Sequence, residues 1–137
     1  MRLHNPLLVG GCGVFPLEED YIIGQFNYVK DYFNKNDGKK VFHVVISVDP
    51  SLRLNEYYLM ELSNLISGFF GSNRQVVYAV HNDKDNLHIH MCVNTVSFVN
   101  GDYRGFFDVK EIKEYAERCL SIVTDERWFN KRTNVEE

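Results

Sequence analysis

Long apolar runs, paired cysteines and an excess of positive charge are all missing from this chain of 137 residues. No apolar stretch approaches the roughly 20 residues that a membrane-spanning helix needs. The N-terminal segment also lacks the long apolar stretch and the small-residue cleavage site of a secretory signal. The sequence therefore predicts a cytoplasmic protein that does not associate with a membrane.

Cysteine is scarce, with only Cys12, Cys92 and Cys119 present. An odd number without CxxC spacing argues against a disulfide framework and against a zinc ribbon. We expect all three to serve as small buried hydrophobic residues.

Positive charge is also in short supply, because 15 Lys and Arg face 19 Asp and Glu, for a net charge of −4. This balance counts against nucleic-acid binding over the whole surface, since neutralising phosphates requires Lys and Arg. The lysines at 30, 35, 39 and 40 and the basic residues at 127, 131 and 132 are nevertheless grouped. Local basic patches and ordinary solvated charge are both compatible with this pattern.

What the chain has is enough material for one core. Its hydrophobic fraction is 45% and its aromatic fraction 14%, so it belongs with globular rather than disordered sequences. The length suits one domain rather than two. We therefore expect residues 1–137 to form a single domain.

Apolar residues recur at helical spacing in three stretches. The first predicted helix covers residues 16–34, with Pro16 at its first position, where a missing N–H is harmless. The second covers residues 52–70 and is followed by Gly71, a type of residue that commonly ends helices. The third begins at Asp108. The predicted buried stripes are Ile22, Phe26, Val29 and Phe33; Leu54, Tyr58, Leu62, Leu65 and Phe69; and Val109, Ile112, Ala116, Leu120 and Val123.

Strand patterns lie between and after the first two helices. Residues 41–48, rich in β-branched side chains, predict a central strand, and residues 75–80 predict another. A long strand over residues 87–99 would turn at Asn100-Gly101 and return over residues 102–106. Strands grouped in hairpins with helices outside the group predict an α+β fold, a mainly antiparallel sheet with the helices packed outside it.

Three of the five histidines fall within ten residues. His88 and His90 point to the same side of their strand, because side chains alternate along a strand. A polar loop over residues 81–86 would bring His81 back beside them. Neutral imidazole is the commonest metal ligand, and three protein ligands with open positions are typical of a catalytic metal site. On first principles, three imidazoles suit Zn²⁺ or Ni²⁺ well.

Other polar residues lie near this cluster in the sequence. Asp83 or Asp85 could accept a hydrogen bond from the second nitrogen of a ligand and fix its tautomer. Asn94 shares the face of His90 if the strand stays regular. His43, in the middle of its own strand, is interpreted as structural.

The segment HNDKDNLHIHMCVNTVSFVNG resembles the metal motif H-x-D-x(4)-H-x-H-x(3)-N of the relaxase and mobilisation nucleases, a family of the HUH endonuclease superfamily. The upstream segments LLVGGCGV and FHVVISVDP are similar to this family in order and spacing, so that the resemblance covers roughly residues 7–123. It implies a relaxase-like fold with a ferredoxin-like core.

The resemblance also implies an activity. Relaxases bind single-stranded DNA at the transfer origin of a mobile element, with other mobilisation proteins as possible partners. Mn²⁺ or Mg²⁺ held by His81, His88 and His90 would polarise the scissile phosphate. A tyrosine hydroxyl, or a histidine in some branches, attacks and retains the 5′ phosphate as a covalent adduct. Asn94 matches the asparagine of the motif, as site support or as a DNA contact.

The nucleophile is where this sequence departs from the family pattern. The family's tyrosine precedes the LVGG-like stretch, but Met1 to Pro6 contain no tyrosine, which predicts an N-terminally truncated domain. Tyr28 and Tyr32 are candidate substitutes because they lie four residues apart on one helical face, a spacing similar to that of replication-initiator relatives. An aromatic packing face is the alternative interpretation. His4 is a further candidate by analogy with the histidine branch.

Three functional hypotheses follow. The first is a metal-dependent relaxase-like endonuclease that nicks single-stranded DNA at a transfer origin, with an unidentified nucleophile. The second is a non-catalytic or degenerate metal- and DNA-binding remnant, or an accessory subunit, of the same mobilisation system. The third is an unrelated metal-dependent phosphodiesterase that uses a metal-activated water.

Overall fold

The computed structural model describes residues 8–83 and 86–124, with only the backbone at positions 82, 83 and 86. Within these ranges, no helix combines the length and the apolar character needed to cross a bilayer. The elements are β1 (Leu8–Cys12), α1 (Glu19–Tyr32), β2 (Val41–Val48), η1 (Pro50–Leu52), α2 (Glu56–Ser67), η2 (Gly68–Phe70), β3 (Val76–Asp83), β4 (Asn86–Asn94) and α3 (Val109–Thr124).

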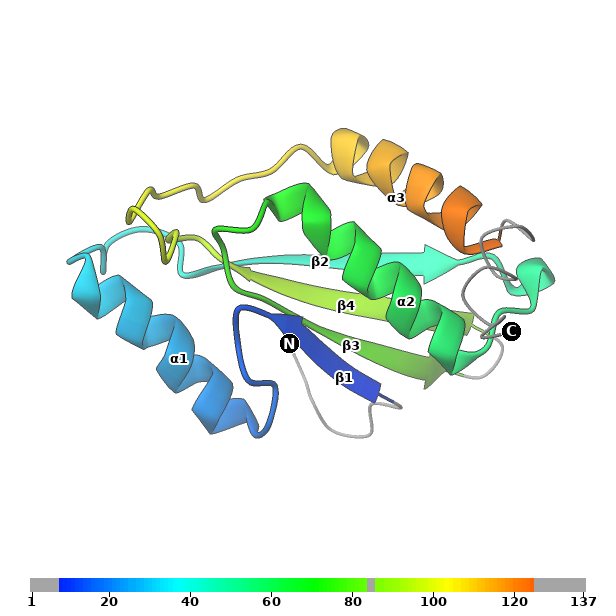
Figure 1. Ribbon diagram of the computed structural model, residues 1–137, viewed down its shortest axis with the longest axis horizontal. Helices are drawn as coiled ribbons and strands as arrows, with labels where there is room; N and C mark the ends of the chain where they lie inside the picture. Colours follow the sequence, from blue (N-terminus) through cyan, green and yellow to red (C-terminus); the bar gives the residue numbers. More distant parts are fainter. Residues whose placement is uncertain (1–7, 84–85, 125–137) are drawn as a thin grey trace, which may run out of the picture.

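The four strands form one antiparallel sheet in the order β1-β3-β4-β2. Helices α2 and α3 cover one face of this sheet, and α1 lies toward the end opposite the β3–β4 connection (Figure 1). The predicted α+β fold with a mainly antiparallel sheet is therefore confirmed.

The larger core lies between the sheet and the pair α2 and α3. Ile89 and Met91 of β4 are completely buried there, as are Leu59 and Ile66 of α2. Cys92 and Cys119 are buried as small apolar side chains, as expected, whereas Cys12 is half-buried.

A smaller core lies on the other face, under α1. Ile22 and Phe26 pack against Val77 of β3 and Cys92 of β4. The predicted stripe of α1 is thus mostly confirmed, with Phe33 only half-buried. This helix covers one end of its face, and no other helix of the described residues packs against the end near the β3–β4 connection.

Helix α1 begins at Glu19 rather than at Pro16. The side-chain amide of Gln25 explains the difference, because it donates to the carbonyl of Phe15 at 2.8 Å and accepts from the backbone N–H of Phe15 at 2.8 Å. These two bonds hold the preceding segment alongside the helix instead of within it.

Helix α2 is also shorter than predicted. Arg53 has a left-handed backbone (φ 55°), and the side chain of Asn55 caps the helix by accepting from the N–H of Tyr58 at 3.0 Å. The buried stripe consequently shifts from the predicted one, with Leu62 the only fully buried residue common to both. The buried apolar side chains of α2 are Leu59, Leu62 and Ile66.

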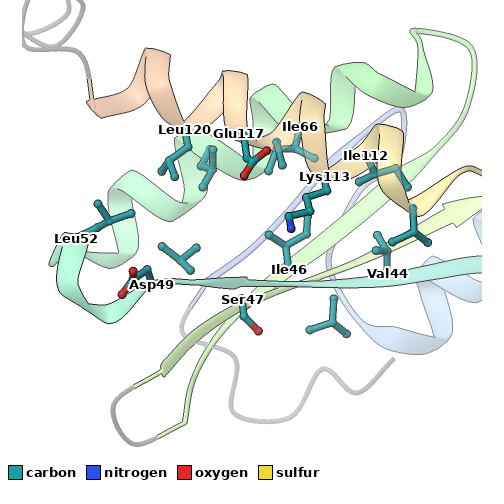
Figure 2. Close-up of a pocket in the computed structure, with 15 residues that line it drawn as sticks. Val44, Ile46, Ser47, Asp49, Leu52, Ile66, Ile112, Lys113, Glu117 and Leu120 are labelled. Atoms are coloured by element: carbon teal, nitrogen blue, oxygen red, sulfur yellow. The ribbon is translucent and has the colours of Figure 1, made fainter.

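Strand β2 spans the predicted residues but lies at an edge of the sheet, so its prediction as a central strand was wrong. The strand is rich in apolar residues although it is only partly buried: Phe42 is buried, whereas Val45 is 45% exposed. An apolar cleft separates β2 from α3, and Figure 2 shows Ile46 pointing into it near Lys113. This cleft lies on the helix-covered face of the sheet.

Strand β1 was missed because glycines weaken the strand pattern. Gly10 pairs with Tyr78, and a Cβ at Gly10 would lie 2.5 Å from the Tyr78 ring. The glycine therefore permits close packing of the edge strand on a large buried side chain.

Strand β4 ends at Asn94, not at residue 99, and no return strand forms over residues 102–106. The side chain of Asn94 accepts from the N–H of Val96 at 3.1 Å, which turns the chain out of the ladder. Only one bridge, between Val96 and Tyr103, remains of the predicted second hairpin.

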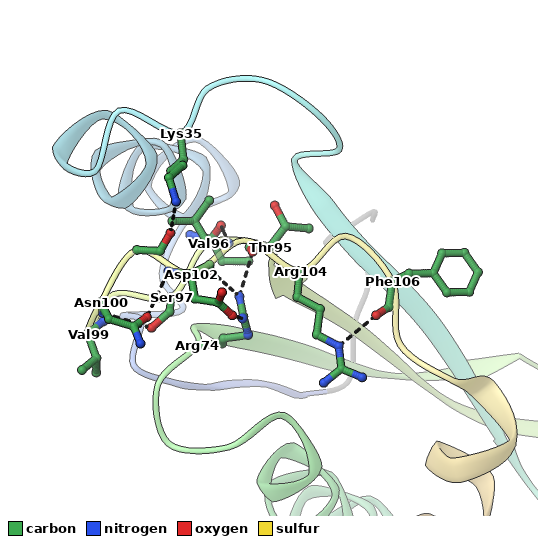
Figure 3. Close-up of polar contacts among 12 residues, drawn as sticks. Lys35, Arg74, Thr95, Val96, Ser97, Val99, Asn100, Asp102, Arg104 and Phe106 are labelled. Carbon is green, nitrogen blue, oxygen red and sulfur yellow. Dashed lines mark hydrogen bonds and ion pairs between the residues drawn. The ribbon is translucent and has the colours of Figure 1, made fainter.

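The loop after β4 is fastened by a buried arginine (Figure 3). Arg74, 5% exposed, donates to the carbonyl of Thr95 at 2.7 Å and to the carboxylate of Asp102 at 2.8 Å. Lys35 donates to the carbonyl of Gly101 at 2.7 Å. The loop is thereby tied both to the sheet and to the chain that follows α1.

Candidate metal centre

Three neighbouring strands place the histidines in rows on the sheet face that α2 and α3 do not cover. His88 of β4 pairs with His81 of β3 on one side and with Ser47 of β2 on the other. His90 lies one row further along β4 and shares the face of His88, because alternate residues of a strand point the same way. The register therefore brings all three histidines to one patch.

The sequence predicted that His81 lies in a loop, but His81 reaches this patch from strand β3. β3 continues to Asp83 and pairs with Asn86, so the connection between β3 and β4 is short. As a result, His81 and His88 are directly opposite each other in the ladder. A regular ladder fixes their spacing more firmly than a polar loop would.

The rings are close neighbours. The ring centroids of His81 and His90 are 4.5 Å apart, and those of His88 and His90 are 6.4 Å apart. In the ranges that the structure describes, no three His, Cys, Asp or Glu side chains stand gathered tightly enough to hold an ion. Closure onto an ion would therefore require rotation of side chains on a backbone that already brings them together.

Two observations bear on whether these side chains could bind a divalent ion. The Nε2 atom of His81 is buried and has no hydrogen-bond partner among the described residues, which is unusual for a polar atom away from water. The Nδ1 atom of His88 lies 3.0 Å from Ser47 Oγ, an arrangement in which an outer partner orients a ligand ring. A metal ion would satisfy the unpartnered nitrogen.

The local electrostatics favour neutral imidazole. Burial lowers the pKa of His90, and the neighbouring rings of His81, His43 and His88 lower it further. A lowered pKa keeps the ring uncharged near neutral pH, so that its lone pair is free for a metal.

His43 is the residue that the sequence interpretation undervalued. Its ring stacks on that of His90 with centroids 5.8 Å apart and planes at 18°, and burial lowers its pKa. His43 and Ser47 lie at alternate positions of β2, on the same face of the sheet as His88 and His90 of β4. This alternation is the sequence signal that could have placed both residues beside the histidines.

Asn94 lies elsewhere, in the scaffold under α1. It is completely buried, and its amide donates to the side chain of Gln75 at 2.8 Å and to the carbonyl of Phe26 at 3.2 Å. Its side-chain oxygen accepts from Lys30. Four residues of strand separate it from His90, or about 13 Å. In this structure Asn94 supports α1 and does not reach the histidine patch.

Tyr28 and Tyr32 are not brought to the histidines either. They lie on the C-terminal half of α1 and are 70% and 72% exposed, so they do not form a packed aromatic face. Tyr28 lines a shallow surface hollow with Gln75. Six residues of strand separate Gln75 from His81, or about 20 Å.

The remaining candidates fall largely outside the described residues. Asp85 and His4 are not described, and neither is the side chain of Asp83. Of the grouped lysines, Lys30 is buried and Lys35 is bonded to the loop, so neither offers a free charge to a phosphate.

The comparison with known proteins identifies the family. Residues 4–121 match the family described as "Relaxase: MobA/VirD2-like, nuclease domain". The chain is 24% identical to "Protein TraI" of Escherichia coli over 105 residues, which are 73% of this chain and 14% of that protein. The chain thus spans about a seventh of the length of that relative. No solved structure matches it. The family match extends over most of the sequence, and the chain therefore belongs to the MobA/VirD2-like relaxase family.

Proposed function

We propose that this domain is a metal-dependent endonuclease that nicks single-stranded DNA at a transfer origin. The observation that carries the proposal is the histidine patch on the sheet face away from α2 and α3, where a buried Nε2 of His81, without a partner among the described residues, lies in a ring close to those of its neighbours His88 and His90. Family membership supports the DNA substrate.

The three histidines would act by binding and orientation. A divalent ion at this site, Mn²⁺ or Mg²⁺ by family and Zn²⁺ or Ni²⁺ by ligand chemistry, would polarise a phosphoryl oxygen. His81 and His88 hold opposite sides of the patch through the β3–β4 ladder, and His90 supplies the neutral ring between them. Among the described residues no helix covers that end of the histidine-bearing face, which would leave room there for a flexible single strand.

The strand break would be a transesterification. An attacking hydroxyl forms the new bond to phosphorus, the bond to the 3′ oxygen breaks, and that oxygen takes up a proton. We assign this attack to neither Tyr28 nor Tyr32, because both lie on the C-terminal half of α1, and Tyr28 lines a hollow with Gln75, about 20 Å along the strand from His81.

A second candidate function is metal and DNA binding without cleavage, as a remnant or accessory subunit. The positions of Tyr28 and Tyr32 favour this second function, because the two tyrosines that the sequence offered as nucleophiles are remote from the histidines. A metal-activated water is the third route, and it would cleave without leaving DNA on the protein.

Metal binding is tested by titrating the metal-free protein with Mn²⁺ in a calorimeter. We expect one ion per chain, lost in the double variant His88→Ala with His90→Ala. His43→Ala is the matched control, because it removes an imidazole from the same face and should leave the stoichiometry at one. Stoichiometric binding retained by the double variant would refute the site.

Cleavage is tested by incubating the protein with Mn²⁺ and single-stranded oligonucleotides that carry a transfer origin. A covalent protein–DNA band, followed by mass spectrometry of the labelled peptide, would identify the nucleophile. Tyr28→Phe and Tyr32→Phe should leave the band intact. Cleavage without a band indicates the water route, and binding without cleavage indicates the non-catalytic function.

A further inference from the structure

Ser47 lies in the same row of the sheet as His81 and His88. It is the direct cross-strand partner of His88, which in turn pairs with His81, so that the three residues run across β2, β4 and β3. Ser47 Oγ lies 3.0 Å from His88 Nδ1. Figure 2 shows the Ser47 side chain directed away from the cleft that Ile46 enters, toward the other face of the sheet.

This contact uses one specific nitrogen of the ring. The nitrogen that faces β2 is Nδ1, so Nε2 is the one left for the side on which His81 and His90 lie. A serine hydroxyl can accept a hydrogen bond as well as donate one, and a neutral imidazole has one nitrogen of each kind. The role of Ser47 therefore decides which nitrogen of His88 carries the proton.

Only one of the two arrangements leaves a useful ligand. When Nδ1–H donates to Ser47 Oγ, Nε2 has a free lone pair directed at the patch. When the hydroxyl donates to Nδ1 instead, Nε2 carries the proton and cannot bind an ion. Partners of this kind, which hold the second nitrogen of a ligating histidine, fix both tautomer and ring orientation.

We propose that Ser47 is a positioning residue that holds His88 in the Nδ1–H tautomer and so presents Nε2 as the ligand atom. This inference rests on the proposed metal site but concerns a property of the metal-free protein. It also assigns a task to β2, which contributes no histidine of the triad. Edge strand β2 would thus set the orientation of one outer ligand through a single hydroxyl.

The test compares Ser47→Val with Ser47→Thr. Valine and threonine have nearly the same shape and both suit a strand, so the pair differs mainly in the hydroxyl. Ser47 is exposed, and neither change disturbs a core. The first measurement is the ¹⁵N NMR spectrum of the His88 ring in the metal-free protein, which distinguishes the two tautomers. The second is calorimetric titration with Mn²⁺.

We expect wild type and Ser47→Thr to show the Nδ1–H tautomer, and Ser47→Val to show a larger share of Nε2–H. Affinity for Mn²⁺ should fall about 10- to 100-fold in Ser47→Val, the range typical for loss of such a partner, and should recover in Ser47→Thr. Equal tautomers and equal affinities in the two variants would overturn the proposal. If wild type binds no ion, the proposed function fails, and the tautomer alone then decides the role of Ser47.

Discussion

The buried ammonium group of Lys30 donates a hydrogen bond to the side-chain oxygen of Asn94, and this contact joins α1 to the end of β4. Lys30 is 1% exposed and is the only charged side chain on the buried stripe of α1 in the described structure. Burial, followed by the charge of Lys40, lowers its pKa from 10.5 to about 8. A charged group without a carboxylate partner here makes the stability of the domain depend on pH.

The first prediction concerns that dependence, measured by denaturant unfolding of wild type and Lys30→Met. Because the folded pKa lies below the unfolded one, the folded state binds fewer protons between pH 8 and pH 10.5. The free energy of unfolding of wild type relative to Lys30→Met should therefore rise with pH in this window. The slope has an upper limit of about 1.4 kcal/mol per pH unit.

The comparison with Lys30→Met removes two opposing contributions. Burial raises the pKa of Cys92 to about 11 and that of Tyr78 to about 12. Because of each of these groups, the protein loses stability as pH rises above the pKa of that group in the unfolded state. Both groups are present in wild type and variant, so their contributions cancel in the difference between the two free energies of unfolding. A difference that stays flat from pH 8 to pH 10 would show that the pKa of Lys30 is not lowered in the folded protein.

The second prediction uses two glycines in opposite surroundings. In Gly10→Ala, the new Cβ would lie 2.5 Å from the ring of Tyr78, which is itself only 5% exposed. We expect this overpacking to destabilise the protein by about 1–3 kcal/mol. In Gly24→Ala, the Cβ meets nothing within 4 Å on helix α1, and higher helix propensity should stabilise by about 1 kcal/mol. Thermal unfolding of both variants measures the two opposite signs.

The third prediction concerns the loop after β4. Arg74→Met keeps an apolar stem but removes the guanidinium bonds to the carbonyls of Thr95 and Asp102, which keep only their backbone bonds from the N–H groups of Arg104 and Ser97. We expect a loss of about 2 kcal/mol, since hydrogen bonds from a charged group contribute about 1.5–3 kcal/mol. Arg104→Met is the control, because Arg104 is exposed and its guanidinium donates to the carbonyl of Phe106 and lies over the ring of Phe107, without bonding to Thr95 or Asp102. Equal destabilisation of both variants would show that the buried guanidinium is not what fastens the loop.

Local pattern was sufficient for much of this fold. The apolar periodicity identified all three helices, and the β-branched run identified β2 at its observed bounds. It failed where side chains bond to nearby backbone, as at Gln25 and Asn55, because those bonds set helix ends without changing periodicity. It also failed for β1, where packing of Gly10 on Tyr78 is a tertiary property.

The site divides in the same way. Alternation along β4 correctly placed His88 and His90 on one face, because it depends only on spacing. The neighbours contributed by β2 depend on strand order and register, which no local pattern specifies. His43 and Ser47 entered the site only once β2 was seen beside β4. Whether the histidines hold a metal stays a prediction for the titration.

The fourth prediction is that His81 carries a cost to stability in the metal-free protein. Its buried Nε2 has no partner in the part of the chain that the structure describes, and a buried unsatisfied polar group costs about 1–3 kcal/mol. His81→Leu removes that atom and keeps an apolar side chain. The free energy of unfolding of the metal-free variant should therefore be about 1 kcal/mol higher than that of the metal-free wild type.

The matched variant is His88→Leu, in which the lost ring has a hydrogen-bond partner in Ser47. It should give no such gain, because no unsatisfied atom is removed. Addition of Mn²⁺ should then reverse the order, stabilising wild type through binding to the folded state and leaving His81→Leu unchanged. A His81→Leu protein that is less stable than wild type without metal would mean that Nε2 has a partner in solution, and the argument for an ion at this position would lose its main support.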